Sequence, residues 1–505
     1  MSRVHGAVLL GVDGVPVEVE VRISSSLPRV DIVGLAEAAV RESGARVRAA
    51  IASAGHPFPD RRVTVNLAPA SVRKSGAGLD LPIAIGILAA AGALDPQTLE
   101  GVAFVGELAL DGRLRPVRGA LALALAVCDA GCCRLIAPTA NAPEAALAPG
   151  IEVLAADDLQ AVIAHLCAVA PLHRAVPPPP EPRSSTLPDL AEVRGQDRAK
   201  RALEIAAAGG HALLFRGPPG SGKTMLARRL PGLLPPFAQA EALEATRIHG
   251  AAGRLGEAGG VLAARPFRAP HHTASAAGIL GGGSPPRPGE VSLAHRGVLF
   301  LDELPEFERR VLEALRQVVE ERQVVIARAR ASCTFPAHFQ LVAAANPCPC
   351  GWRLSPERDC RCDDLAIARY SARISGPLLD RFDLHVRVPA VTWSELERAG
   401  DGPSSDEVRG RVELARACQE TRLAPHGART NAEIPDSTLD TLVCATPPAR
   451  ALLGRAMDKL RLSARGARRV LRVARTVADL EGADRVDAAA VAEALSYRED
   501  GPSGA

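Results

Sequence analysis

Apolar and polar positions alternate along the first third of the chain in a way that predicts a mixed α/β domain. Residues 17–23 and 62–67 alternate with a period of two, which indicates strands with one buried face. Residues 36–54 and 81–91 have the spacing of helices. Residues 171–188, which include four consecutive prolines, predict an extended spacer. We therefore expect an α/β domain over 1–170 and a linker over 171–188.

A second pattern follows the linker. Residues 212–215 form a short apolar run before a glycine-rich turn, and residues 224–234 read as a helix that Pro235 and Pro236 end. A strand, a glycine-rich loop and a helix in this order are typical of a nucleotide-binding α/β domain. The sequence becomes helical and arginine-rich from about residue 394. These patterns predict an α/β ATPase core over 189–393 and a helical domain over 394–505.

Composition adds limits to this picture. The chain has 505 residues, and this length fits about three domains. Its longest apolar run, residues 81–94, contains a proline and is shorter than the roughly 20 residues of a membrane helix, so we expect a cytoplasmic protein without membrane contact. The net charge of +3 is close to neutral, so any surface for nucleic acid must be local.

The glycine-rich turn carries the clearest chemistry. Residues 217–224 read GPPGSGKT, which matches the phosphate-loop pattern G-x-x-x-x-G-K-[ST] between a strand and a helix. Backbone N–H groups of such a loop converge on phosphate oxygens, the lysine reaches the outer phosphates, and the threonine ligates magnesium. We therefore expect ATP and Mg²⁺ to bind at Gly217, Pro218, Pro219, Gly220, Ser221, Gly222, Lys223 and Thr224.

Later strand ends offer the remaining groups for ATP hydrolysis. An apolar strand after residue 297 ends in Asp302 and Glu303, which suit the magnesium shell and the polarisation of the attacking water. A third strand, residues 340–345, ends at Asn346, whose amide can orient that water. Arg381 and Arg465 are candidates for neutralising transition-state charge. Each arginine can instead be part of a surface ion pair.

Four cysteines form a compact CPC-x9-CRC pattern. Cys348, Cys350, Cys360 and Cys362 can supply the four thiolates of a structural zinc site, although the C-x-C spacing is tighter than the usual C-x2-C. Free reduced thiols are the alternative. The adjacent His271 and His272 read either as a loop contact to substrate or neighbour or as ordinary polar loop residues.

Arginines mark two candidate contact surfaces. Residues 324–335 read as a β-hairpin with Arg328 and Arg330 near its tip, and these side chains are candidates for gripping a DNA backbone, with a solvated hairpin tip as the alternative. Four arginines at helical spacing share one face and can serve ATP, a neighbouring subunit or DNA; they are Arg465, Arg468, Arg469 and Arg472.

Together these motifs resemble the YifB/ComM family of magnesium-chelatase-like AAA+ proteins. The resemblance covers nearly the whole chain and includes PFRAPHHT at 266–273, a triple glycine at 281–283, NPCPCG at 346–351 and ISGPLLDR at 374–381. It implies a homo-hexameric ring in which Arg381 acts on the ATP of a neighbouring subunit. For ComM members it also implies branch migration of DNA during natural transformation.

The N-terminal segment resembles the Lon-protease-like domain, which has a ribosomal S5 domain 2-like fold. VNLAP at 65–69 and GELALDGRLRPV at 106–117 carry this resemblance. A Lon peptidase needs a serine activated by lysine, and its two positions fall near Gly78 and Leu121 here. Lys74 and Ser75 are neighbours whose side chains diverge on an extended chain. We therefore expect a domain without peptidase activity.

Three functions compete on these grounds. A helicase-like DNA translocase is the favoured hypothesis. A protein- or complex-remodelling ATPase of the magnesium-chelatase type, without a DNA substrate, is the main alternative. An ATP-dependent protease would need a catalytic dyad that the sequence lacks.

Overall fold

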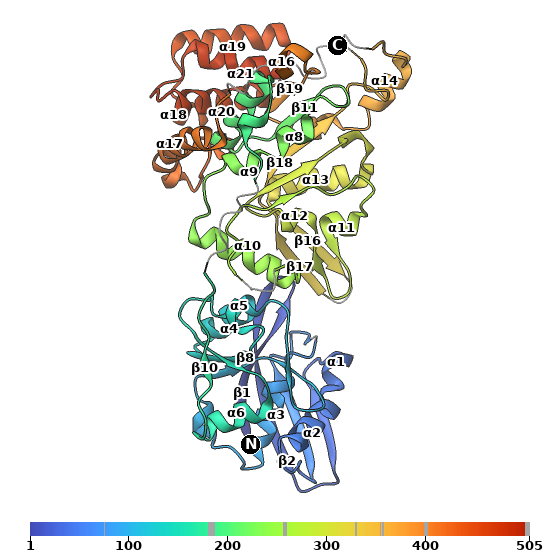
Figure 1. Cartoon of the computed structure of the whole chain (residues 1–505), viewed down its shortest axis with the longest axis vertical. Helices are drawn as coiled ribbons and strands as arrows, with labels where there is room; N and C mark the ends of the chain where they lie inside the picture. Colours follow the sequence, from blue (N-terminus) through green and yellow to red (C-terminus); the bar gives the residue numbers. More distant parts are fainter. Residues whose placement is uncertain are drawn as a thin grey trace.

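The computed structural model has an elongated shape, with the N-terminal unit at one end and the central and helical units at the other (Figure 1). It describes residues 1–74, 76–179, 187–255, 260–328, 331–353, 355, 358–397 and 402–499. None of the helices in these ranges is both long and apolar enough to cross a membrane.

The N-terminal unit is built on an eight-stranded sheet in the order β10-β9-β8-β5-β1-β2-β4-β3. One face packs on α2, α3 and α6, and the other packs on α4 and α5. The strands are β1 (Ser2–Leu10), β2 (Asp13–Ser24), β3 (Arg29–Val33), β4 (Arg62–Ala68), β5 (Val102–Phe104), β8 (Arg134–Pro138), β9 (Glu152–Ala156) and β10 (His173–Arg174), with a small separate pair β6 (Glu107–Leu108) and β7 (Leu114–Arg115). The helices are α1 (Ala38–Arg41), α2 (Ser43–Ser53), α3 (Asp80–Ala90), α4 (Ala120–Asp129), α5 (Ala142–Ala145) and α6 (Leu159–Leu166).

Two details differ from the sequence prediction. His173 and Arg174, inside the predicted spacer, pair with β9 as an edge strand, because the chain still follows the sheet before the prolines begin. The helix predicted over 224–234 is two short helices, α8 (Lys223–Ala227) and α9 (Leu230–Leu233), with Pro231 at the start of the second. A proline is accepted in the first turn of a helix but not in its interior, so it divides this segment.

The central unit contains a five-stranded parallel sheet in the order β12-β15-β18-β11-β19. The strands are β12 (Phe267–Arg268), β15 (Val298–Leu301), β18 (Gln340–Ala345), β11 (Leu213–Arg216) and β19 (Leu384–Arg387). The remaining strands of this unit form two hairpins, β13 (Gly281–Gly282) with β14 (Arg287–Pro288) and β16 (Gln323–Arg328) with β17 (Ala331–Pro336). Its helices are α7 (Asp197–Gly209), α8, α9, α10 (Gln239–Ala251), α11 (Ala276–Leu280), α12 (Glu290–Leu293), α13 (Arg309–Glu321), α14 (Asp364–Ser371) and α15 (Gly376–Leu379).

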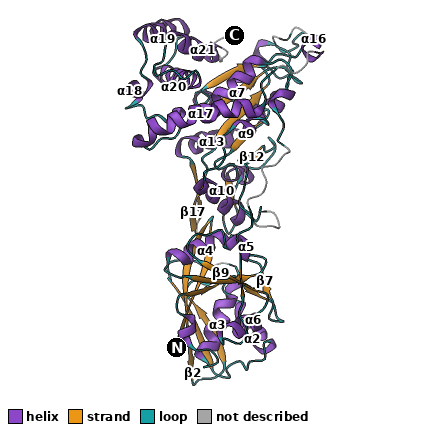
Figure 2. Ribbon diagram, turned by 60° about the vertical axis from the view of Figure 1, so that its left-hand side comes forward, coloured by secondary structure: helices purple, strands orange, loops and turns teal. Residues whose placement is uncertain are grey.

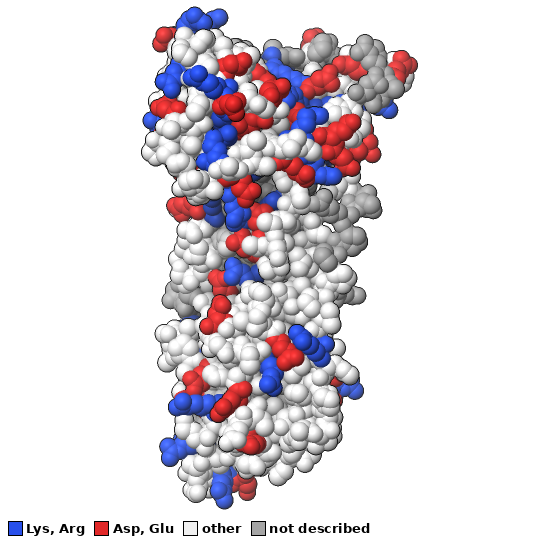
Figure 3. Space-filling view, turned by 90° about the vertical axis from the view of Figure 1, so that its left-hand side faces the viewer, with Lys and Arg blue, Asp and Glu red and all other residues white. Residues whose placement is uncertain are grey.

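The C-terminal unit is helical, as predicted, and packs against the central unit (Figure 2). Its helices are α16 (Trp393–Glu397), α17 (Ser405–Leu423), α18 (Leu439–Val443), α19 (Pro447–Leu460), α20 (Ala464–Leu480) and α21 (Ala488–Glu499). Side chains of α7, α17 and α20 share one apolar core. On the face shown in Figure 3, lysines, arginines and acidic residues crowd over this end of the molecule more densely than over the N-terminal unit.

The predicted hairpin joins the central and N-terminal units. Its strands pair from Gln323 with Pro336 to Arg328 with Ala331, which confirms the hairpin. Phe335 and Cys333 are buried against Val12, in the turn between β1 and β2, and against α10. Asp13 and Arg247 add an ion pair of 2.9 Å across the same junction. The hairpin therefore connects the N-terminal unit directly to the central unit.

Candidate nucleotide and metal sites

The phosphate loop and the acidic strand end meet at the carboxyl edge of the central sheet. β11, β15 and β18 are neighbours in this sheet and run parallel, so the residues that follow them emerge on the same side. Thr224 Oγ1 donates a hydrogen bond of 2.6 Å to Asp302 Oδ2. Lys223 Nζ lies 3.3 Å from Asn346 Oδ1. The fold therefore brings together four predicted site residues from three separate segments, with 78 positions between Thr224 and Asp302 and 123 between Lys223 and Asn346.

Lys223 is turned toward its own loop in this structure. Its ammonium donates to the carbonyl oxygens of Gly217 and Pro218 at 2.8 and 2.7 Å. Burial lowers the pKa of Lys223, and the charges of Asp302 and Glu303 oppose that shift. To reach a phosphate group, the ammonium would have to leave these two carbonyl oxygens.

Other features of the loop fit a phosphate. Gly220 and Gly222 have φ angles of +76° and +87°, which favour glycine and let the backbone turn its N–H groups inward. Among the described residues, Ser221 is one of the few whose buried side-chain oxygen has no hydrogen-bond partner. A buried hydroxyl without a partner is costly, and a phosphate oxygen in the loop would satisfy it. The residues present therefore fit a nucleoside triphosphate with magnesium.

Glu303 has a contact that the sequence did not reveal. His272 Nδ1 lies 3.1 Å from Glu303 Oε2, and the His272 ring also stacks against His271 with ring centroids 4.2 Å apart. Glu303 has a positive φ of 52°, a conformation that costs energy for a residue with a side chain. The contact arises because β12, which leads into the histidines, lies beside β15 in the sheet. The sequence could not reveal this contact, because it depends on the order of the strands in the sheet and not on a local motif.

Arg381 and Arg465 lie away from this site. Arg381 follows α15 and precedes β19, which places it at the amino edge of the sheet, opposite the phosphate loop of its own chain. It is buried and forms an ion pair with Glu320 of α13. Burial, together with repulsion from Arg469 and Arg465, lowers the pKa of Arg381. Arg465 therefore belongs to the electrostatic surroundings of Arg381.

The other arginines of the predicted helical stripe have acidic partners. Arg468 and Arg472 each lie 2.6 Å from Asp436, and Arg469 lies 3.3 Å from Asp383. These contacts join α20 to the rest of the C-terminal helical unit, called the lid from here on, and to Asp383 just before β19. The DNA-contact candidates are less defined, because Arg330 and the side chain of Arg328 lie outside the described residues.

The four predicted metal ligands come together. The sulfur atoms of Cys348, Cys350, Cys360 and Cys362 all lie within 4.8 Å of one another, and three of the separations are 3.4, 3.6 and 3.6 Å. A tetrahedral zinc ion with Zn–S bonds of about 2.3 Å requires sulfur separations of about 3.8 Å. The donor set fits a structural zinc ion.

This cysteine loop touches the phosphate loop. Gly351 has a φ of +83°, and a side-chain carbon at this position would lie 2.6 Å from Cδ of Pro219. The close approach needs glycine, because any larger residue would displace one loop or the other. The cysteine cluster is therefore placed to hold the phosphate loop from outside.

The peptidase dyad has no support in the described residues. The Lys74 side chain is fully buried, and its ammonium donates to the carbonyl oxygen of Pro69. Burial lowers the pKa of Lys74. Ser75 lies outside the described residues, so its position stays untested.

Comparison with known proteins gives matches along nearly the whole chain. Profiles described as magnesium chelatase subunit ChlI match residues 189–396 and 19–141, and the C-terminal part of the same subunit matches residues 402–498. An uncharacterized YifB protein of Escherichia coli is 45% identical over 504 residues, and the competence protein ComM of Haemophilus influenzae is 44% identical over 510 residues. Each alignment covers 99% of this chain and 97% of the relative. A shorter match, 29% identical over 96 residues, is to the DNA replication licensing factor Mcm6 of Drosophila melanogaster; it covers 19% of this chain and 10% of that protein.

Proposed function

The chain belongs to the YifB/ComM family of magnesium-chelatase-like proteins, and we propose that it is an ATP-hydrolysing AAA+ motor that moves branched DNA as a homo-hexameric ring. The observation that carries the ATPase part is the meeting of Lys223, Thr224, Asp302 and Asn346 at one sheet edge.

Each residue of this edge has a role in the proposed reaction. The loop N–H groups and Lys223 hold the phosphates of ATP, while Thr224 and Asp302 hold Mg²⁺, which neutralises charge on the phosphate oxygens. Glu303 polarises the attacking water, and Asn346 orients it.

The catalytic site is completed from a second subunit. Arg381 lies at the opposite edge of the sheet from its own phosphate loop, so it cannot reach an ATP bound by the same chain. In a ring, the amino edge of one subunit faces the carboxyl edge of the next, and Arg381 with Arg465 then neutralises charge on the neighbouring ATP.

DNA as the substrate has separate support. One full-length relative is named a competence protein, and the partial relative Mcm6 is named a DNA replication licensing factor. The predicted DNA contacts Arg328 and Arg330 belong to the hairpin sequence, and two other residues of this hairpin, Cys333 and Phe335, pack on the N-terminal unit. A hairpin anchored in this way can transmit movement between the two units.

Measurement of ATP hydrolysis with and without a four-way DNA junction tests both parts. We expect Mg²⁺-dependent hydrolysis that Lys223→Ala lowers at least about 100-fold and that the junction stimulates. Lys459→Ala, on the distant helix α19, is the matched control and should behave as the unchanged protein.

Two outcomes would contradict the proposal. Equal hydrolysis by Lys223→Ala and the unchanged protein would remove the ATPase assignment. Normal hydrolysis without any response to DNA would instead favour the remodelling ATPase suggested by the magnesium chelatase matches.

A further inference from the structure

A cavity of about 280 Å³ lies at the amino edge of the central sheet, between the ATPase core and the helical lid. It is lined by residues that directly precede the strands or begin them: Ala212 before β11, Gly297 before β15, Gln340 at the start of β18 and Asp383 before β19. The phosphate loop lies at the other ends of the same strands. The cavity is therefore separate from the nucleotide site of its own chain, and its size is near the lower end of the roughly 300–1,000 Å³ usual for small-molecule pockets.

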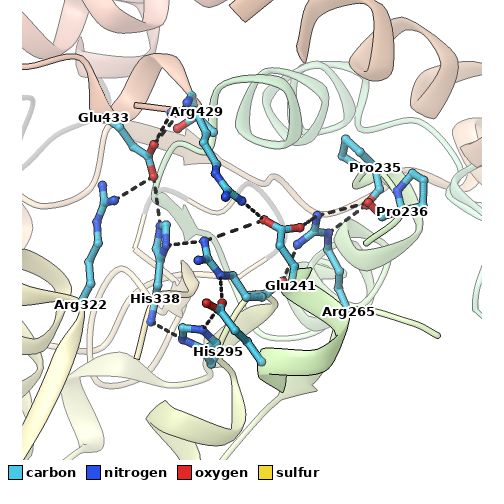
Figure 4. Close-up of polar contacts among 12 residues, drawn as sticks. Pro235, Pro236, Glu241, Arg265, His295, Arg322, His338, Arg429 and Glu433 are labelled. Carbon is cyan, nitrogen blue, oxygen red and sulfur yellow. Dashed lines mark hydrogen bonds and ion pairs between the residues drawn. The ribbon is translucent and has the colours of Figure 1, made fainter. Parts of the chain in front are cut away.

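The lining has an excess of positive charge. Eight arginines and three acidic residues line the cavity. Three further carboxylates outside the lining pair with Arg296, Arg381 and Arg472; they are Glu244, Glu320 and Asp436. Glu241 is shared by Arg265 at 2.8 Å, Arg429 at 2.7 Å and Arg296 at 3.8 Å, as Figure 4 shows in part. Arg296 also pairs with Glu244 at 2.9 Å, so Glu241 is left mainly to Arg265 and Arg429. One carboxylate neutralises only part of the charge of these two guanidinium groups, which repel one another across a partly buried space.

The second acidic residue at this end is also shared. Glu433 lies 3.0 Å from Arg322 and 3.1 Å from His338, so it has little capacity left for the arginines deeper in the cavity (Figure 4). The third, Asp383, already contacts His211 and Arg469. The carboxylates of the lining are thus fully engaged.

Two guanidinium groups of the lining keep hydrogen-bonding capacity that the described residues do not use. Arg416 donates hydrogen bonds to the carbonyl oxygen of Ala207. Within the described part of the chain, no carboxylate lies within ion-pair distance of Arg416. Nε of Arg381, a side chain that is 93% buried, has no hydrogen-bond partner. Burial and the nearby charge of Arg265 lower the pKa of Arg416 to about 10, which reflects the same excess of cations.

We propose that this cavity binds a small oligophosphate anion, which bridges arginines of the ATPase core and arginines of the lid. Guanidinium groups bind phosphate oxygens through paired hydrogen bonds, and a multivalent anion would supply the negative charge that the lining lacks. Arg265 and Arg296 come from the core, whereas Arg416 and Arg429 come from the lid. The bound anion would therefore hold the lid against the core.

Binding of inorganic pyrophosphate to the full-length protein tests this site. The Lys223→Ala variant is used because its phosphate loop is weakened, and calorimetric titration should still show one pyrophosphate per chain. Adding Arg416→Gln and Arg429→Gln should weaken this binding at least about tenfold, because charge-assisted hydrogen bonds are lost. Adding Arg455→Gln, an exposed residue of α19, should leave it unchanged.

Further variants keep the test decisive. Arg416→Lys retains the positive charge and should retain most of the binding, and it guards against loss through misfolding. The site would be rejected if Lys223→Ala bound no pyrophosphate, or if Arg416→Gln with Arg429→Gln bound it as tightly as Lys223→Ala. Failure of this site would leave the ATPase measurements unaffected.

Discussion

The two edges of the central sheet carry opposite chemistry. At the carboxyl edge, Thr224, Asp302 and Glu303 form an acidic centre beside a phosphate loop, and one lysine lies among them. At the amino edge, eight arginines surround a cavity with three acidic residues. The acidic edge suits a metal and a water molecule, whereas the basic edge suits phosphate oxygens. In a ring in which unlike edges meet, Arg381 of the basic edge would complete the acidic centre of the next subunit.

The largest expected effect comes from removing Arg381, which we propose acts from the amino edge of one subunit on the ATP at the carboxyl edge of the next. Arg381→Ala should lower kcat for ATP hydrolysis by about 10³-fold, the lower range for loss of an arginine finger. Arg450→Ala, on the surface of α19, is the control. Steady-state phosphate release measures both.

Mixing variants tests whether Arg381 acts on a neighbour. Lys223→Ala and Arg381→Ala subunits are both inactive alone, but in mixed rings an intact phosphate loop can face an intact arginine. We expect mixtures to recover part of the activity. Mixtures that stay inactive would indicate that Lys223 and Arg381 must act in the same subunit. That result would contradict the proposal that the two edges of the sheet meet between subunits.

The amino edge should also contribute to stability in a pH-dependent way. Burial favours a higher pKa for Glu433, but the hydrogen bond from His338 and the charge of Arg322 outweigh it and lower the pKa to about 2. Because the folded pKa lies below the ordinary value near 4.3, the stabilisation is present above the ordinary value and is lost as pH falls toward 2. Glu433→Gln should therefore lower the free energy of unfolding by about 3 kcal/mol at pH 7.

Denaturant unfolding of both proteins at pH 7 and pH 3 measures this contribution. The difference between them should shrink at pH 3, where part of the stabilisation of the unchanged protein is gone. A difference that stays constant with pH would show that Glu433 acts through packing rather than through its charge.

The carboxyl edge should depend on the cysteine cluster that supports it. Cys348→Ser with Cys350→Ser should remove about one equivalent of zinc per chain and weaken ATP binding about tenfold, because Gly351 would no longer hold Pro219 in place. Metal analysis and nucleotide titration measure the two effects. Cys418→Ser, an exposed cysteine on α17, is the matched control. Equal zinc content in both variants would exclude the site.

The sequence was most informative where function depends on consecutive residues. The phosphate loop and the acidic strand end are local motifs on strands that apolar runs mark clearly, so Lys223, Thr224 and Asp302 could be predicted to meet. The cysteine cluster was also visible, because its four ligands lie within fifteen positions. Sheet topology then converts these local signals into a site.

The amino edge could not be predicted in this way. Arg265, Arg296, Arg416 and Arg429 come from loops and helices far apart in sequence, and nothing in their local patterns distinguishes them from other arginines of an arginine-rich chain. Their proximity depends on how the lid packs on the core. The same reason hid the burial of Phe335 against the N-terminal unit, because a hairpin pattern does not say what covers its faces.

The smallest expected effect concerns His272, which contacts Glu303 from the neighbouring strand. His272→Ala should lower kcat about threefold with little change in KM, because the carboxylate would lose one group that orients it but would keep its place beside Asp302. His272→Asn can still donate a hydrogen bond and should recover part of the loss. His271→Ala, which removes the stacked ring without touching Glu303, is the control. A change in KM alone would mean that His272 acts on ATP binding and not on the position of the carboxylate, and the carboxyl edge would then have to be described without it.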